Sequence, residues 1–129
     1  MASGKKIMVV DDEPNIRDLL YKFFSREGYQ CFVAKDAEEA TAILKSKKPD
    51  IVFLDIKLPG IGGVDILKMT KQYDQDVSVV MISGHADENT AKETLQLGAF
   101  EYICKPIDLE RIREILAQIE IAKFANNAL

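Results

Sequence analysis

The sequence lacks long apolar runs and an excess of positive charge, and it has no tryptophan, one histidine and two cysteines. No apolar run approaches the roughly 20 residues that a membrane-spanning helix needs, and no signal-peptide pattern opens the chain. Asp and Glu outnumber Lys and Arg by 21 to 17, whereas binding to nucleic acid requires clustered basic residues. We therefore expect a cytoplasmic protein that contacts no membrane and no nucleic acid directly.

The sequence does contain a regular alternation of short β-rich stretches and helix-length amphipathic stretches along its 129 residues. The predicted strands are mostly apolar throughout, which is typical of parallel strands covered on both faces. They are Ile7–Val10, Gln30–Ala34, Ile51–Leu54, Val77–Ile82 and Phe100–Cys104. This alternation predicts an α/β fold, a single flavodoxin-like domain with a five-stranded parallel sheet in the order 2-1-3-4-5 and helices on both faces.

Helix end signals lie between the predicted strands. Pro14 suits the first turn of a helix, and Gly28 suits the position just beyond its end. Asp36 and Glu39 form the capping-box pattern at the start of the second helix. The sequence therefore predicts five helices, of which the last three lie over 64–72, from 87 to 98, and from 108 onward.

The domain limits and the state of the cysteines follow from this arrangement. We expect a flexible N-terminus over 1–5, one domain over 6–122, and a C-terminal tail or the start of a linker over 123–129. Cys31 and Cys104 both fall in apolar strands, which predicts buried, reduced thiols. They would lie on opposite edges of the sheet, four strand spacings of about 4.8 Å apart, so this strand order excludes a disulfide between them.

Charged or hydroxyl-bearing residues follow four of the five predicted strands. Asp11 and Asp12 follow the first strand, Asp55 the third, Ser83 the fourth and Lys105 the fifth. In an open α/β sheet, ligands bind beyond the carboxyl ends of the strands at the switch point, here between the first and third strands. The sequence therefore predicts a pocket in which three carboxylates meet beside a hydroxyl and an ammonium group.

The chemistry of such a pocket can be derived from its side chains. Three carboxylates at close range repel one another unless a cation joins them. Oxygen ligands without His or Cys suit a hard divalent ion, and we predict Mg²⁺, with Mn²⁺ as an alternative. Lys105 can neutralise phosphoryl oxygens and Ser83 can donate a hydrogen bond, which leaves Asp55 as the nucleophile. These residues indicate transfer of a phosphoryl group to Asp55.

Four motifs within residues 5–120 together resemble the response-regulator receiver family of the CheY-like superfamily: Val-Val-Asp11-Asp12-Glu13-Pro14, Asp55-Ile-Lys57-Leu-Pro59-Gly60, Met-Ile-Ser83-Gly84 and Lys105-Pro106. The resemblance implies a two-component phosphorelay protein, a signalling module rather than an enzyme, that catalyses its own phosphorylation and dephosphorylation. It also implies the metal ligands. Asp12 would bind Mg²⁺ directly and Asp11 mainly through water, together with Asp55 and the backbone carbonyl of Lys57.

The resemblance also implies a switch. Lys105 would contact the phosphoryl group, and the Lys105–Pro106 peptide bond would be cis. Phosphorylation of Asp55 would draw Ser83 inward, and Tyr102 would rotate into the space that Ser83 leaves. The face formed by the fourth helix, the fifth strand and the fifth helix would then change. The alternative reading of Tyr102 is a half-buried core aromatic without a switching role.

The partners that the resemblance implies are a histidine kinase or phosphotransfer protein, which donates the phosphoryl group, and an output domain or target protein. A homodimer through the face of the fourth helix, fifth strand and fifth helix is a further option. The stretches Ser83–Ala86 and Gly98–Glu110 are similar to those of receivers in NtrC-type transcriptional activators.

Two further residues and two competing functions complete these expectations. Lys57 and His85, each two residues past a site residue, are predicted to tune the dephosphorylation rate, although His85 also fits a solvated loop residue. A phosphatase of the haloacid-dehalogenase type also uses a strand-end aspartate, but it has a second Asp two residues later, where this chain has Lys57. A pseudo-receiver that binds partners without phosphorylation would not require the acidic pocket.

Overall fold

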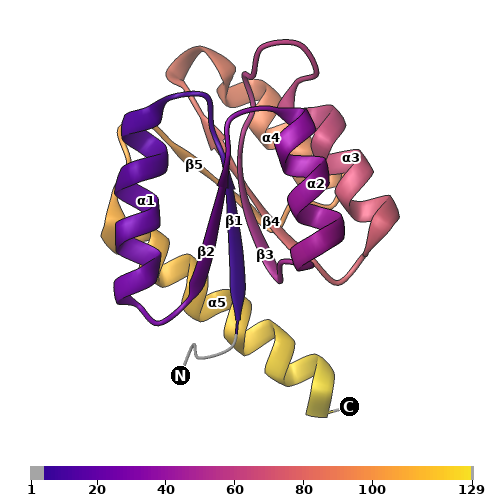
Figure 1. The fold of residues 1–129 in the computed structure, drawn as a ribbon. Coiled ribbons are helices and arrows are strands. Elements are labelled where there is room, and N and C mark those ends of the chain that lie inside the picture. The colour runs from indigo at the N-terminus through magenta and orange to yellow at the C-terminus, as the bar shows by residue number, and fades with distance from the viewer. Residues whose placement is uncertain (1–4, 129) are drawn as a thin grey trace.

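The computed structural model describes residues 5–128, in which strands and helices alternate along the chain (Figure 1). The elements are β1 Lys6–Val10, α1 Pro14–Arg26, β2 Gln30–Ala34, α2 Ala37–Lys47, β3 Ile51–Asp55, α3 Gly63–Tyr73, β4 Ser78–Ser83, the short 3₁₀ turn η1 His85–Asp87, α4 Glu88–Gln96, β5 Glu101–Cys104 and α5 Leu109–Ala128. The predicted strands and helices all form, with boundaries that differ from the predictions by a few residues at most in the first four helices.

The five strands form one parallel sheet in the order β2-β1-β3-β4-β5, which confirms the predicted flavodoxin-like fold. Helices α1 and α5 cover one face of the sheet, and α2, α3 and α4 cover the other (Figure 1). Along β1, Ile7 and Val9 pack toward α1 and α5, whereas Met8 and Val10 pack toward the other three helices. Because both faces of the central strands are buried, these strands have almost no polar residues.

The predicted helix starts at Pro14 and Asp36 are present. Pro14 is the first residue of α1, where its missing N–H leaves no hydrogen bond unmade. Asp36 caps α2 by accepting a hydrogen bond of 2.9 Å from the backbone N–H of Glu39, and Glu39 Oε1 accepts one of 2.9 Å from the backbone N–H of Lys35. The first bond satisfies an N–H group that the first turn of a helix otherwise leaves without a partner, and the second holds the residue that precedes the cap.

The cysteine prediction is right for the bonding state and wrong for the burial of Cys104. Both thiols are free, and the two residues lie on β2 and β5, at opposite edges of the sheet. Cys31 is partly buried, and burial raises the pKa of its thiol to about 12. Cys104 is exposed because it ends the edge strand β5 and, like Tyr102, lines an open hollow beside α4 and α5. An apolar strand therefore did not guarantee burial at its last residue.

Both ends of the predicted domain can be followed in the described residues. Residues 1–4 lie outside the described residues, but Lys5 is placed, with its Nζ 2.7 Å from Glu120 Oε2. Helix α5 continues without a break past residue 122 to Ala128 and carries Ile121 and Phe124 exposed to solvent. Among residues 5–128, no helix combines the length and apolar character that crossing a membrane requires.

Candidate functional site

Three carboxylates meet at the carboxyl edge of the sheet. Asp55 is the last residue of β3, and Asp11 and Asp12 follow the last residue of β1, its neighbour in the sheet. One oxygen from each residue lies within 4.8 Å of the others. Asp11 and Asp55 are buried, whereas Asp12 is exposed. The topology therefore places the three predicted acidic residues together, with one side of the group open to solvent.

Lys105 supplies a cation to the buried pair. Its Nζ lies 3.4 Å from Asp11 Oδ2 and 3.4 Å from Asp55 Oδ2, and it also contacts the carboxylate of Glu13. The backbone N–H of Lys105 donates a hydrogen bond of 2.8 Å to the carbonyl of Ser83, which joins the ends of β4 and β5. The Lys105–Pro106 peptide bond is cis, as the resemblance implies.

Glu13, the residue after Asp12, also belongs to this group, although it was not among the predicted site residues. Its backbone N–H donates a hydrogen bond of 2.9 Å to Asp11 Oδ1, and its side chain binds the ammonium of Lys105. The residue directly follows the two aspartates, so a loop that turns back over the pocket brings a third consecutive acid to it. The position of Glu13 directly after Asp11 and Asp12 is the sequence feature that could have indicated its place in the site.

Burial and mutual repulsion shift the pKa values of the carboxyl groups. Burial, followed by the nearby charge of Asp11, raises the pKa of Asp55 from its ordinary 3.8 to about 6. Burial also raises the pKa of Asp11. Burial alone would lower the pKa of Lys105, but the hydrogen bond to Glu13 and the charges of Asp11 and Asp55 outweigh it and raise that pKa above its ordinary value. The pocket therefore keeps its ammonium charged and resists full ionisation of its acids.

The acidic group fits a hard divalent cation. Asp11 Oδ2 is fully buried and, apart from the ammonium of Lys105 at 3.4 Å, has no hydrogen-bond partner among the described residues, so it has room for a further positive ligand. Asp12 and Asp55 offer oxygens nearby, and all three ligands are carboxylates, which Mg²⁺ prefers over softer ions. The backbone N–H of Lys57 donates a hydrogen bond of 3.1 Å to Asp55 Oδ1, which fixes the loop after β3 beside the group.

The predicted switch residues occupy neighbouring strands. Ser83 is buried at the end of β4, and its hydroxyl donates a hydrogen bond of 2.8 Å to the carbonyl of Gly84. Tyr102 is half-buried on β5, and its hydroxyl donates a hydrogen bond of 3.2 Å to Glu88 Oε2 at the start of α4. Tyr102 lines a hollow of about 370 Å³ together with Glu88, Asp108 and Arg111. In this structure Tyr102 is therefore attached to α4 and not to Ser83.

The two residues predicted to tune the rate lie on the loops around Asp55. Lys57 belongs to the loop after β3, and its Nζ lies 3.8 Å from Asp87 Oδ1. His85 begins the η1 turn after β4, but its side chain lies outside the described part of the structure. The loops that carry Lys57 and Asp87 are thus in direct contact.

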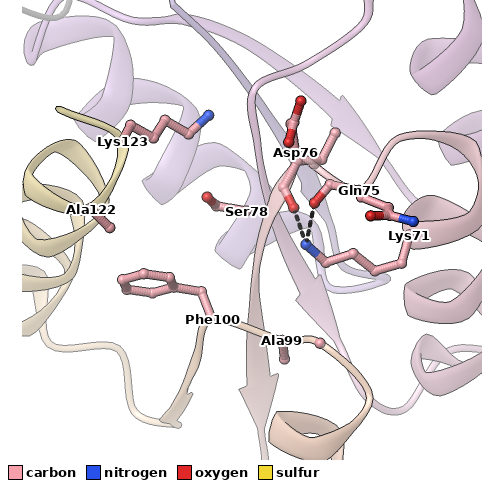
Figure 2. A pocket seen from close by; sticks show the side chains of 10 residues that line it. Lys71, Gln75, Asp76, Ser78, Ala99, Phe100, Ala122 and Lys123 are labelled. Carbon is pink, nitrogen blue, oxygen red and sulfur yellow. Dashed lines mark hydrogen bonds between the residues drawn. The ribbon is translucent and has the colours of Figure 1, made fainter. Parts of the chain in front are cut away.

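A larger hollow of about 640 Å³ lies at the opposite ends of β4 and β5, between α3 and α5 (Figure 2). The ammonium of Lys71 donates hydrogen bonds to the carbonyl oxygens of Gln75, at 3.1 Å, and of Val77 (Figure 2). These bonds fasten the loop that joins α3 to β4, so the role of Lys71 is structural. The hollow lies far from the carboxylates and takes no part in their chemistry.

Replacing Lys71 therefore tests stability and not activity. Lys71→Met should lower the free energy of unfolding by about 1–2 kcal/mol, because two hydrogen bonds to a charged donor are lost. Lys68→Met, at an exposed position of the same helix, should change it by less than about 0.5 kcal/mol. Urea unfolding of both variants measures the difference, and equal losses would contradict the assigned role.

The pKa of Asp55 predicts how stability depends on pH in metal-free solution. A carboxyl group whose pKa is higher in the folded than in the unfolded chain costs stability once it ionises, so stability falls as pH rises from about 4 to about 6. Asp55→Asn removes this cost and should be more stable than the wild type by roughly 1–3 kcal/mol at pH 7. Urea unfolding with a chelator at several pH values measures this; parallel pH profiles of the two proteins would refute it.

Known proteins share both the sequence pattern and this arrangement. Residues 7–117 match the family described as response regulator receiver domain. The chain is 38% identical over 111 residues to sporulation initiation phosphotransferase F of Bacillus subtilis, a match that covers 86% of this chain and 90% of that protein. It is 39% identical over 108 residues to the nitrogen assimilation regulatory protein NtrX of Azorhizobium caulinodans, where it covers 82% of this chain and 24% of NtrX. The chain thus spans about a quarter of the length of that regulator.

Solved structures agree with the family match. The receiver domain of NtrX from Brucella abortus superimposes with a TM-score of 0.83 at 38% identity, covering 88% of this chain and 96% of that chain. A response regulator receiver domain from Clostridium thermocellum superimposes with a TM-score of 0.88 at 28% identity, covering 94% and 98% of the two chains. The family match spans β1 from its second residue, the other four strands, and the first half of α5 up to residue 117. This chain therefore belongs to the response regulator receiver domains, the phosphorelay modules of two-component signalling.

Proposed function

We propose that Asp55 is the residue that accepts the phosphoryl group. The observation that carries this proposal is the position of its carboxylate, buried at the end of β3, near the oxygens of Asp11 and Asp12 and 3.4 Å from the ammonium of Lys105. Asp55 is the only one of the three acids that lies on the central strand β3, directly before the loop that carries Lys57 and next to β4, which ends at Ser83.

The transfer requires a nucleophile and positive charge. An oxygen of Asp55 forms a bond to the phosphorus of the donor, the bond from phosphorus to the donor breaks, and its electron pair leaves with the donor. Mg²⁺ held by Asp11, Asp12, Asp55 and the backbone carbonyl of Lys57 would neutralise the carboxylates and the phosphoryl oxygens. Lys105 supplies a second positive charge, which stabilises the negative charge of the transferring group. The domain thereby catalyses its own phosphorylation, and the same site allows hydrolysis.

The signal then leaves the site through Ser83 and Tyr102. The hydroxyl of Ser83 breaks its hydrogen bond to the carbonyl of Gly84 and donates instead to a phosphoryl oxygen. Tyr102 breaks its hydrogen bond to Glu88 and rotates into the space beside Ser83. Breaking the bond between Tyr102 and Glu88 frees the start of α4. A charge added at Asp55 thus biases a two-state element that includes α4, β5 and the adjoining face of α5.

The partners follow from the family. A histidine kinase or phosphotransfer protein donates the phosphoryl group, and an output domain, a target protein or a second copy of the chain binds the face of α4, β5 and α5. Lys57 and His85 tune the lifetime of the phosphoryl group from the two loops beside Asp55. These assignments carry the roles of the family onto matching positions of this chain.

The proposal is tested with a small-molecule donor. The protein is incubated with acetyl phosphate and Mg²⁺, and its intact mass is measured. We expect the wild type to gain one phosphoryl group, and we expect no gain for Asp55→Asn, whose side chain is similar in shape but lacks the nucleophilic charge. Asp65→Asn, at an exposed position of α3, is the control and should gain the group like the wild type. An equal gain by Asp55→Asn would refute the proposal.

A further inference from the structure

An ion pair joins the two loops that lie on either side of Asp55. Lys57, two residues after Asp55, places its Nζ 3.8 Å from Asp87 Oδ1. Asp87 ends the η1 turn, four residues after Ser83. Among the side chains that the structure describes, this is the one ion pair that connects the loop after β3 with the loop after β4. The pair therefore spans the two loops that the phosphorylation chemistry uses.

The two members of the pair are held very differently. The side chain of Asp87 is 19% exposed, whereas that of Lys57 is 77% exposed. The backbone N–H of Asp87 donates a hydrogen bond of 3.0 Å to the carbonyl of Gly84, and its Oδ2 lies over Gly84, 3.7 Å from the position of a Cβ there. Asp87 thus has a bonded backbone and a mostly buried side chain close to Gly84, the residue after Ser83. Lys57 is a long, solvated side chain whose charged end Asp87 holds.

We propose that Asp87 is a positioning residue that shortens the lifetime of the phosphoryl group by holding the ammonium of Lys57 away from it. This inference rests on the proposed function of Asp55 as phosphoacceptor. A phosphoryl group carries up to about two negative charges and three acceptor oxygens, so it competes with Asp87 for the nearest mobile cation. Lys57 can change partner because its side chain is long and exposed, whereas Asp87 remains in place.

The position of Lys57 then affects hydrolysis. In that step the oxygen of a water molecule bonds to phosphorus, the bond from phosphorus to Asp55 breaks, the carboxylate keeps the electron pair, and inorganic phosphate leaves with the protons of the water. An ammonium paired with the phosphoryl oxygens binds them before and during the step, so by its charge alone it changes the rate little. Its alkyl chain, however, covers the side of the group that faces solvent and obstructs the approach of water. Releasing Lys57 from Asp87 therefore slows hydrolysis.

The test is a double-mutant cycle on the lifetime of the phosphoryl group. Wild type, Asp87→Asn, Lys57→Met and the double variant are phosphorylated with acetyl phosphate and Mg²⁺, freed of donor, and followed by intact mass. We expect Asp87→Asn to lengthen the lifetime about two- to fivefold, the range set by the strength of an exposed ion pair. In the Lys57→Met background, Asp87→Asn should change nothing, because no ammonium remains to be released. Asp65→Asn serves as the control for loss of one negative charge on a neighbouring element.

The outcomes separate this inference from the function on which it rests. If all variants are phosphorylated but Asp87→Asn decays at or above the wild-type rate, or lengthens the lifetime equally with and without Lys57, the positioning role is overturned. If the wild type gains no phosphoryl group, the assignment of Asp55 fails and this inference fails with it. If Asp87 had a merely structural role, the effect of Asp87→Asn on the lifetime would be the same with and without Lys57. That effect would also remain in 1 M salt, where a largely exposed ion pair is screened.

Discussion

Gly63→Ala should lower the free energy of unfolding by about 3 kcal/mol or more, which is large for the addition of one methyl group. Gly63 begins α3 directly beside the end of β3. A Cβ at this position would lie 2.1 Å from the carbonyl oxygen of Asp55 and 2.8 Å from the Cα of Ile56. Both are backbone atoms in a close-packed region, so α3 or β3 must shift to relieve the overlap. Because the overlap involves Asp55 itself, binding of Mg²⁺ should weaken along with stability.

Gly62→Ala is the matched control for this variant. A Cβ at Gly62 would lie 3.6 Å from the carbonyl oxygen of Ile56, an ordinary contact, and its extended backbone is open to any residue. We expect a change of less than about 1 kcal/mol. Urea unfolding compares the stabilities, and a Mg²⁺ titration compares the sites. Equal stabilities of the two variants would mean that the close approach of α3 to Asp55 is not as tight as described.

Lys105→Met should slow phosphorylation of Asp55 by acetyl phosphate about 10²-fold, the typical effect of removing one group that stabilises transition-state charge. It should at the same time tighten Mg²⁺ binding. Lys105 Nζ lies 3.4 Å from oxygens of both Asp11 and Asp55, so its charge repels a cation that these carboxylates bind. A slower reaction with a stronger metal site is the signature of a residue that acts on the phosphoryl group.

Lys105→Arg is the conservative comparison. It keeps the charge and should recover part of the rate, although a planar guanidinium does not reproduce the geometry of an ammonium. Rates of adduct formation and Mg²⁺ affinities are measured for all three proteins. A Lys105→Met variant that loses rate and metal binding together would indicate damage to the pocket, and one that keeps the wild-type rate would remove Lys105 from the proposed chemistry.

Most of the fold follows from local patterns in the sequence. The apolar strands and the helix starts at Pro14 and Asp36 are local signals, and rules of connection then leave few possible strand orders. The errors lie where local patterns carry no information about neighbours. Cys104 lies in an apolar stretch of the sequence, which predicted burial. It is exposed because it ends an edge strand and lines an open hollow.

The site divides in the same way. Asp11, Asp12, Asp55, Ser83 and Lys105 were predictable because parallel strands bring their carboxyl ends to one edge. The contacts of Glu13 and Asp87 were not, because they depend on how the loops fold back over that edge. Glu13 had a weak signal in its adjacency to two acids, whereas nothing in the sequence relates Asp87 to Lys57. The lack of room for a Cβ at Gly63 likewise results from tertiary packing, which local sequence patterns do not show.

The central claim is that Asp55, and neither of its acidic neighbours, carries the phosphoryl group. Reduction of the phosphorylated protein with borohydride converts a phosphorylated aspartate into homoserine, and peptide mass spectrometry then identifies the converted position. We expect homoserine at position 55 alone, formed only when the donor and Mg²⁺ are both supplied. Homoserine at Asp11 or Asp12, or conversion at none of the three after full phosphorylation, would contradict the account.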